Sequence, residues 1–277
     1  MGVYRRGFFC DDETIMYPMK PETVNLVALL LIAFVPQLIV IIVTESFRLY
    51  RFENEYLSKV ECGRSKPVRL LSRVLKFYGY SLLILVICSF LTAVTKNAVG
   101  RLRPNFLDVC QPTIDWRHNC TTHEYLTDYE CTAKRSDWQM KDARLSFFSG
   151  HSSMSMSMGM FIVVYLQSRA AGECWLNTLI PVIQSLAFCG AIYVGLTRIF
   201  DHKHHWSDVL TGLTVGMVIV ILVWKFVAGY DLAPIKQRSR KVLCNNEELE
   251  MKEAVVNGNG RAYLNGSFER TGSNQRL

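Results

Sequence analysis

The stretch Asn25–Thr44, NLVALLLIAFVPQLIVIIVT, contains no charged residue and decides the fold class. An apolar run of about 18 or more residues is long enough to cross a bilayer as a helix. Four further runs follow at 77–95, 152–167, 177–196 and 208–228; the run 152–167 is the weakest, because it is short and rich in serine and methionine. The sequence therefore predicts an all-α, multi-pass transmembrane helical bundle of five spans in one membrane domain, residues 25–231.

The net charge of +7 is concentrated in two basic segments. Residues 47–76 hold Arg48, Arg51, Lys59, Arg64, Lys66, Arg69, Arg73 and Lys76, and the segment after the last span opens with Lys236, Arg238, Arg240 and Lys241. Basic loops of membrane proteins stay in the cytoplasm, and an even number of crossings separates these two segments. We therefore expect residues 1–24 to be exoplasmic and the polar tail 232–277 to be cytoplasmic and disordered. The basic residues are not interleaved with aromatics on a soluble face, which argues against a nucleic-acid partner.

Three short segments carry candidate chemistry: 96–104 (KNAVGRLRP), 148–151 (FSGH) and 197–208 (TRIFDHKHHWSD). They lie at the end of the second span, the start of the third, and between the fourth and fifth. If the chain crosses in strict alternation, all of them meet at one exoplasmic membrane boundary. One extra or missing crossing would separate them.

The residue types in these segments suit a phosphate monoester. Arg103 and Arg198 can each offer a planar fork of donors to phosphate oxygens, and Lys96 adds a point charge. Ser149 and Gly150 precede a helix, so backbone N–H groups and the positive helix end should face the anion. These groups can neutralise a phosphoryl group without a metal.

Two histidines can perform the reaction. His204 and Asp208 are four residues apart, which on a helix places them on one face, so that the carboxylate can orient the imidazole. The other ring nitrogen of His204 then becomes a nucleophile. His151 begins the facing helix and can protonate the leaving alkoxide.

The motifs are Lys96-x6-Arg103-Pro104, Ser149-Gly150-His151 and Thr197-Arg198-x5-His204-x3-Asp208. Together they resemble the signature of the type 2 phosphatidic acid phosphatases, a superfamily that includes vanadium haloperoxidases. The strings GRLRPNFLDVC, RLSFFSGHSS and KHHWSDVLTG resemble the animal lipid phosphate phosphatases in particular. The resemblance implies that His204 is the nucleophile, His151 the general acid and Asp208 the residue that orients His204. It implies that Lys96, Arg103, Ser149, Gly150 and Arg198 bind the substrate phosphate.

The resemblance also implies a function and a setting. Family substrates are phosphatidate, lysophosphatidate, sphingosine 1-phosphate and ceramide 1-phosphate, which are cleaved through a phosphohistidine, without Mg²⁺ or another cofactor, on the exoplasmic or lumenal side. We expect a homo-oligomer in the lipid bilayer of the plasma membrane, with an endomembrane left open. The family usually has six spans, and this chain begins where the loop after the first would lie, so we expect that first helix to be absent. Thr197 stands where the family usually has serine.

Other readings of the same residues are weaker. A metal cluster of His202, His204 and His205 with Asp201 or Asp208 would leave the nearby cations unexplained, because they repel a metal ion. A channel or transporter would place ionisable residues inside the spans, where this sequence has almost none. A catalytically silent, lipid-binding or hetero-oligomerising isoform stays open as the alternative function.

The long loop 96–150 has features of an exoplasmic segment. It holds Cys110, Cys120 and Cys131, and Cys10 lies on the same side, so one or two disulfides are expected there. It also holds Asn119-Cys120-Thr121, a weak glycosylation sequon at Asn119. A loop of this length is usually functional.

Overall fold

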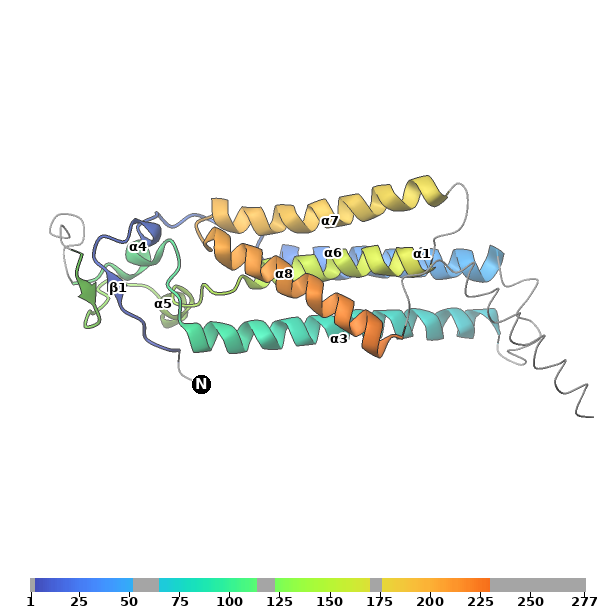
Figure 1. Cartoon of the computed structure of the whole chain (residues 1–277), viewed down its shortest axis with the longest axis horizontal. Helices are drawn as coiled ribbons and strands as arrows, with labels where there is room; N and C mark the ends of the chain where they lie inside the picture. Colours follow the sequence, from blue (N-terminus) through green and yellow to red (C-terminus); the bar gives the residue numbers. More distant parts are fainter. Residues whose placement is uncertain (1–2, 52–64, 114–122, 170–175, 230–277) are drawn as a thin grey trace, which may run out of the picture. The chain divides into compact units, whose positions relative to one another are not determined.

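The protein is described by a computed structural model that covers residues 3–51, 65–113, 123–169 and 176–229. Its long helices are α1 (Leu26–Arg51), α3 (Lys66–Val99), α6 (Gly150–Arg169), α7 (Leu176–Phe200) and α8 (Trp206–Leu222), which a π-helical turn η2 (Val223–Val227) continues. They form one bundle (Figure 1). The prediction of an all-α, multi-pass bundle is confirmed. The tail 232–277 and Asn119 lie outside the described residues.

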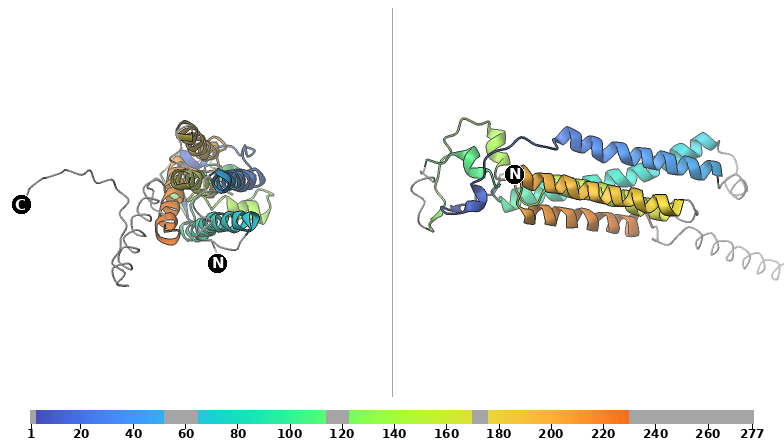
Figure 2. Two further views of the ribbon diagram at one scale, coloured as in Figure 1. Left: turned by 90° about the vertical axis from the view of Figure 1, so that its right-hand side faces the viewer. Right: turned by 90° about the horizontal axis from the view of Figure 1, so that it is seen from above.

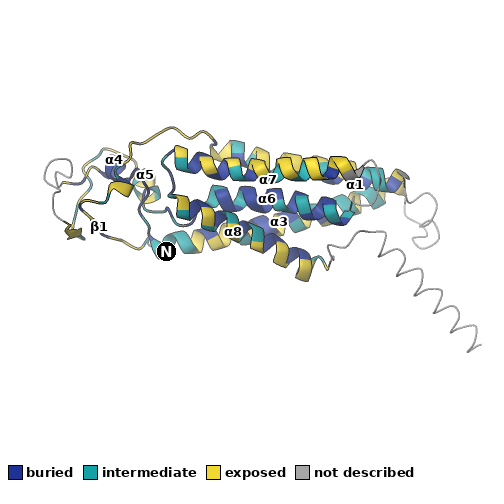
Figure 3. Cartoon of the chain, turned by 45° about the horizontal axis from the view of Figure 1, so that its top comes forward, coloured by how far each residue is buried: buried dark blue, intermediate teal, exposed yellow. Residues whose placement is uncertain are grey.

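Helix α6 lies at the centre of the bundle and packs against α1, α3, α7 and α8. Most of its residues are buried, as Figure 3 shows. In the described parts of the chain, α1, α3, α7 and α8 are the helices long and apolar enough to cross a membrane, four in all, so α6 is not counted by this criterion although the sequence predicted a span there. The reason is its position: a helix surrounded by other helices can present serine and glycine to them, because it does not face lipid.

The outer helices expose apolar side chains (Figure 3). Examples are Leu31 and Val35 on α1, Leu75 and Val86 on α3, Val182 and Leu186 on α7, and Val218 and Ile221 on α8. An apolar exterior on helices of this length is what lipid tails accept as a neighbour. The chain is accordingly a multi-pass membrane protein.

A small cap layer gathers at one end of the bundle (Figures 1 and 2). It consists of β1 (Phe8–Phe9), η1 (Glu13–Ile15), α4 (Phe106–Cys110), β2 (Tyr125–Leu126) and α5 (Asp137–Asp142). Strands β1 and β2 pair antiparallel, with Phe8 opposite Leu126. The layer has its own apolar core around Phe8 and Phe106, and a disulfide joins Cys110 to Cys131. Cys10 is disulfide-bonded as well.

Local signals set the helix ends that face this cap layer. The Asn25 side chain accepts a hydrogen bond from the Ala28 N–H at 2.8 Å and so caps α1. Helix α3 ends at Gly100, whose φ of +58° is a left-handed conformation that favours glycine. Its N–H donates to the Lys96 carbonyl oxygen at 3.1 Å, so Lys96 lies in the last turn of α3.

A buried charge pair joins α1 to α6 away from the cap layer. Glu45 is fully buried and accepts hydrogen bonds from Nε and Nη2 of Arg169, both at 2.9 Å. The Tyr165 hydroxyl donates to the same carboxylate at 3.1 Å. A bidentate pair of this kind fixes the rotation of the two helices about their axes.

Candidate active site

Asp208, in the first turn of α8, is the most connected carboxylate at the cap end of the bundle. Its Oδ2 accepts from the Ser146 hydroxyl at 2.6 Å and from the His205 N–H at 3.0 Å. Its Oδ1 accepts from Nη1 of Arg101 at 2.6 Å. The side chain is fully buried, so these donors replace water and hold the carboxylate in one orientation.

His204 lies beside this carboxylate, but by a different geometry from the one the spacing predicted. Helix α8 begins at Trp206 with His205 as its N-cap, so His204 precedes the helix, and the prediction that His204 and Asp208 share a helix face is wrong. The two are nevertheless close, because Asp208 folds back over the N-terminus of α8 in a capping box with His205. His204 Nδ1 is 3.8 Å from Asp208 Oδ2, a distance that is long for a hydrogen bond.

The segment Ser149–His151 meets Asp208 directly. The Ser149 N–H donates to the Asp208 carbonyl oxygen at 3.1 Å, and the Ser149 hydroxyl accepts from the Ser152 hydroxyl at 2.9 Å. Ser149 therefore caps α6 and ties it to α8. Because its N–H is used in this way, the amides of Gly150 and His151 are the ones that α6 offers to an anion.

The two arginines of the motifs are buried and paired with carboxylates. Arg103 is 6% exposed, and its Nη2 lies 2.6 Å from Asp142 Oδ1. Arg198 is 1% exposed, and its Nη2 lies 2.9 Å from Asp201 Oδ2. Glu22, on the amino-terminal segment, approaches Arg198 Nη1 at 3.9 Å. Acidic groups thus occupy these cations, as a phosphate would.

The predicted phosphate-binding cations lie at the end of the bundle where His151 is in the first turn of α6: Lys96 is in the last turn of α3 and Arg198 in the last turn of α7, and Arg103 follows α3. His151 Nε2 is buried, with no hydrogen-bond partner in the described parts of the chain. His204 Nδ1 is in the same situation. A buried polar atom of this kind is one that a ligand or water completes. The structure thus brings every predicted catalytic and phosphate-binding residue to one end of the bundle.

His204 sits in an environment that disfavours its charged form. Burial lowers the pKa of its imidazole well below the ordinary value of 6.5. Asp208 opposes that shift, while the positive charges of Arg103 and Lys96 add to it. A shift in this direction favours the neutral imidazole, which is the form that can act as a nucleophile.

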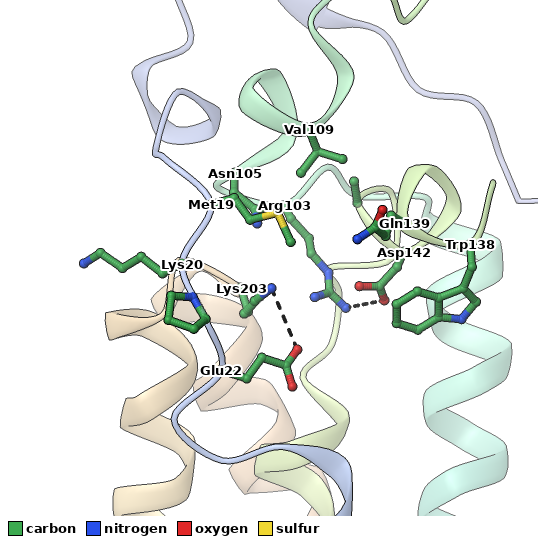
Figure 4. Close-up of a pocket in the computed structure, with 12 residues that line it drawn as sticks. Met19, Lys20, Glu22, Arg103, Asn105, Val109, Trp138, Gln139, Asp142 and Lys203 are labelled. Carbon is green, nitrogen blue, oxygen red and sulfur yellow. Dashed lines mark hydrogen bonds and ion pairs between the residues drawn. The ribbon is translucent and has the colours of Figure 1, made fainter. Parts of the chain in front are cut away.

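A cavity of about 240 Å³ opens beside these residues (Figure 4). Its lining comes from the amino-terminal segment, the loop after α3, α4, α5 and the α7–α8 loop: Met19, Lys20, Pro21, Glu22, Arg103, Asn105, Val109, Trp138, Gln139, Asp142, Ala143 and Lys203. Arg103 lines it, whereas neither histidine of the motifs does. The cavity therefore adjoins the phosphate-binding residues rather than enclosing the reacting atoms.

The amino-terminal segment is held across the site. The Thr23 N–H and hydroxyl donate to Asp201 at 2.8 and 2.7 Å, and the Met19 N–H donates to Asp108 at 2.9 Å. These bonds join the segment before α1 to the α7–α8 loop and to α4. They also place Glu22 against Arg198.

The sequence did not identify four residues of this network. Arg101 and Ser146 each donate a hydrogen bond to the Asp208 carboxylate. Glu22 and Lys203 form an ion pair at 3.8 Å. His205 was interpreted as a loop or supporting residue, and it caps α8. Arg101 and Lys203 had a signal in the sequence, because both lie inside the quoted motifs, Arg101 two residues before Arg103 and Lys203 directly before His204.

No group of three or more His, Cys, Asp or Glu side chains within residues 3–51, 65–113, 123–169 and 176–229 is arranged to hold a metal ion.

Comparison with known proteins places the chain in a family. The sequence profile described as the PAP2 superfamily matches residues 77–230, which contain all of the motif segments. The chain belongs to the PAP2 superfamily. Among its curated members, phospholipid phosphatase 2 of Homo sapiens is 35% identical over 253 residues, 91% of this chain and 82% of that protein. Phospholipid phosphatase 1 of Rattus norvegicus is 36% identical over 242 residues, 86% of this chain and 80% of that protein.

A PAP2 relative in Caenorhabditis elegans, named phospholipid phosphatase homolog 1.2 homolog, is 36% identical over 216 residues, which are 78% of this chain and 63% of that protein. The chain thus spans less than two thirds of this relative. No solved structure matches the chain.

Proposed function

We propose that this PAP2 superfamily protein is a lipid phosphate phosphatase that forms a phosphohistidine on His204 and needs no Mg²⁺. Its substrates would be phosphatidate, lysophosphatidate, sphingosine 1-phosphate and ceramide 1-phosphate, each converted to the dephosphorylated lipid and phosphate. The observation that carries the proposal is the position of His151, His204 and the cations Lys96, Arg103 and Arg198 at the helix ends on one side of the bundle. The names of the relatives support a phospholipid phosphate as the substrate class.

In the first step, Nε2 of neutral His204 attacks phosphorus while the bond from phosphorus to the lipid oxygen breaks. His151 gives its proton to the departing oxygen, which leaves as the lipid alcohol. Asp208 faces Nδ1 of His204 at 3.8 Å and stabilises the positive charge that develops on the ring. Phosphate binding brings negative charge beside both imidazoles, which favours protonated His151.

In the second step, His151 takes a proton from water, and the oxygen of that water attacks the phosphorus of the phosphohistidine. The nitrogen–phosphorus bond breaks, His204 becomes neutral again, and inorganic phosphate leaves. One water is consumed, and the proton on His151 is restored. In both steps, Lys96, Arg103, Arg198 and the first amides of α6 stabilise the negative charge on the phosphoryl oxygens. This electrostatic stabilisation dominates the catalysis of phosphoryl transfer.

The acidic partners of the two arginines fit this role. Arg103 and Arg198 are buried cations that pair with Asp142 and Asp201. An uncompensated buried charge is costly, so the site needs an anion at all times. A phosphate dianion can take over part of that role.

The test is phosphate release from phosphatidate in detergent micelles containing EDTA. The His204→Ala variant should lower kcat by at least about a thousandfold, as loss of a nucleophile does. His202→Asn is the matched control: His202 has a φ of +55°, which asparagine tolerates, and its Nδ1 contacts the Pro18 carbonyl oxygen outside the phosphate site. It should keep activity close to that of the parent.

A rapid alkaline quench with phosphorus-labelled substrate should leave label on His204. Activity that EDTA removes and Mg²⁺ restores would contradict the metal-free mechanism. If the folded parent chain and the folded His202→Asn control both release no phosphate, the catalytically silent isoform becomes the leading function.

A further inference from the structure

We propose that the cavity beside Arg103 is a subsite for a hydrogen-bond donor carried by the lipid next to its phosphate, a hydroxyl or an ammonium group, and that Asn105 is its acceptor. This rests on the proposed function, because it assumes that a lipid phosphate binds at Arg103. It adds a residue that selects among lipid phosphates according to the group beside the phosphate.

Asn105 is an acceptor without a donor. It lines the cavity, is 3% exposed, and its Oδ1 has no hydrogen-bond partner within the described parts of the chain. Asn105 is the N-cap of α4, where an asparagine side chain usually accepts from the N–H two or three residues later. Here it makes no such bond, so its buried carbonyl oxygen lacks the donor that a ligand in the adjoining cavity could supply.

Arg103 places this acceptor next to the phosphate. It lies two residues before Asn105 and lines the same cavity, and its Nε is also buried without a partner in the described residues. Figure 4 shows both side chains in the wall of the cavity, with Arg103 turned toward Asp142. One ligand can therefore place its phosphate at Arg103 and an adjacent donor at Asn105.

The charges of the cavity favour a donor over a second anion. Every cation that lines it has a described partner: Arg103 with Asp142, Lys203 with Glu22 at 3.8 Å, and Lys20 with the Phe200 carbonyl oxygen at 3.3 Å. Arg103 Nε is left for the phosphate, and Asn105 Oδ1 is the acceptor left beside it, which attracts a hydroxyl or ammonium and repels an anion.

The size of the cavity suits the polar part of a lipid. About 240 Å³ holds the few atoms beside a phosphate and is too small for an acyl chain as well. Trp138, which is 70% exposed, stands at the side of the cavity (Figure 4). An exposed tryptophan is a side chain that favours the head-group region of a bilayer, where such a lipid is held.

The test compares substrates in matched pairs with the full-length protein in micelles. In the hydroxyl pair, a monoacylglycerol phosphate with a free central hydroxyl is compared with its O-methyl ether. In the amine pair, a sphingoid-base phosphate is compared with its N,N,N-trimethyl form, which keeps the positive charge but has no N–H donor. The parent should favour the free donor by roughly tenfold in kcat/KM in at least one pair, the effect of one buried hydrogen bond.

The Asn105→Leu variant should bring that ratio to about one, whereas Asn105→Asp, which keeps an acceptor of the same shape, should preserve it. Misfolded molecules hydrolyse neither substrate of a pair. Partial misfolding therefore does not change the ratio of the two kcat/KM values. Discrimination in one pair alone identifies the donor as hydroxyl or as ammonium, and either result supports the subsite.

A parent ratio of one in both pairs, or a ratio that Asn105→Leu leaves unchanged, would overturn the proposal. Release from the O-methyl ether that is lost in His204→Ala would show that the proposed function survives such a failure. No release from any of the substrates would reject the proposed function itself.

Discussion

At the scale of single residues, the site is arranged around the Asp208 carboxylate. Three donors from three places in the chain, Arg101, Ser146 and His205, fix its two oxygens. His204 is held less tightly, at 3.8 Å. If His204 is the nucleophile, as proposed, its orientation depends on groups that do not touch the substrate.

The Ser146→Ala variant tests this dependence. It removes an O–H donor at 2.6 Å from a buried carboxylate, and a hydrogen bond to a charged group contributes about 1.5–3 kcal/mol. We expect kcat to fall about tenfold or more with little change in KM, because the variant misorients Asp208 without touching the phosphate. Ser168→Ala is the control, since Ser168 is also buried in the bundle and its hydroxyl donates to the Tyr165 carbonyl oxygen, away from Asp208. An equal loss in both variants would assign Ser146 to general packing.

The pH dependence follows from His204, whose pKa is lowered well below 6.5 by burial and by the nearby cations. The nucleophile must be neutral, so a lower pKa extends activity to lower pH. The pH dependence of kcat/KM reports the free enzyme. We therefore expect the midpoint of its acid limb to lie below about pH 6.5. A pH profile in micelles measures it. An acid limb at or above that value would show that the buried histidine does not have this environment in the membrane protein.

Glu22 should weaken anion binding. It lies 3.9 Å from Arg198 and 3.8 Å from Lys203 and is 35% exposed, so its effect is screened by solvent. The Glu22→Gln variant should bind vanadate, an analogue of the phosphoryl group, roughly three- to tenfold more tightly, since about 1 kcal/mol of competition is removed. Inhibition constants at constant ionic strength measure this. Glu13→Gln, an exposed site in η1, should leave them unchanged; a similar shift there would indicate a general charge effect.

The sequence predicted the residues that the proposed function assigns to the phosphate and missed those that support them. Lys96, Arg103, His151 and His204 lie in short motifs whose spacing fixes their order along the chain. Ser146 and Glu22 contribute through contacts with α8 and with the α7–α8 loop, and no local pattern marks them. The spacing of His204 and Asp208 indicated the right neighbours by the wrong geometry, because the chain enters α8 only at Trp206.

At the scale of elements, α6 and α8 carry opposite halves of the site and approach closely. A Cβ at Gly212 would lie 2.6 Å from the Ser149 carbonyl oxygen. This glycine therefore sets the spacing between the Asp208 and His151 segments. Helix α6 was the least apolar of the predicted spans for a related reason, because its small residues permit neighbours to pack against it.

The Gly212→Ala variant should separate the two halves of the site. The added methyl group meets backbone, which cannot move aside as a side chain does, so α8 must shift outward. A displacement of about 1 Å at reacting groups can reduce rates about a hundredfold. We expect kcat to fall by roughly that factor. Gly190→Ala on α7 has no atom within 4 Å of the new Cβ and should retain activity. Equal activity in the two variants would contradict close packing at Gly212.

At the scale of the whole molecule, the charges on the helices predict an orientation in the membrane. The helix ends away from the cap layer carry Arg48 on α1 and Lys66, Arg69 and Arg73 on α3. Basic residues at membrane boundaries remain in the cytoplasm. The disulfide between Cys110 and Cys131 lies at the other end, and disulfides persist on the oxidising side. The two criteria are independent and agree.

This orientation predicts an enzyme that acts on lipids outside the cell or in a lumen. Intact cells that express the chain should release phosphate from an added monoacyl lipid phosphate, and cells with His204→Ala should not exceed the background of the host. An epitope after Leu277 should react with antibody only after permeabilisation. A glycan removable by endoglycosidase and absent in Asn119→Gln would mark the same face as exoplasmic. Epitope staining of intact cells would reverse the orientation, and the cap layer, with the site beneath it, would then face the cytoplasm.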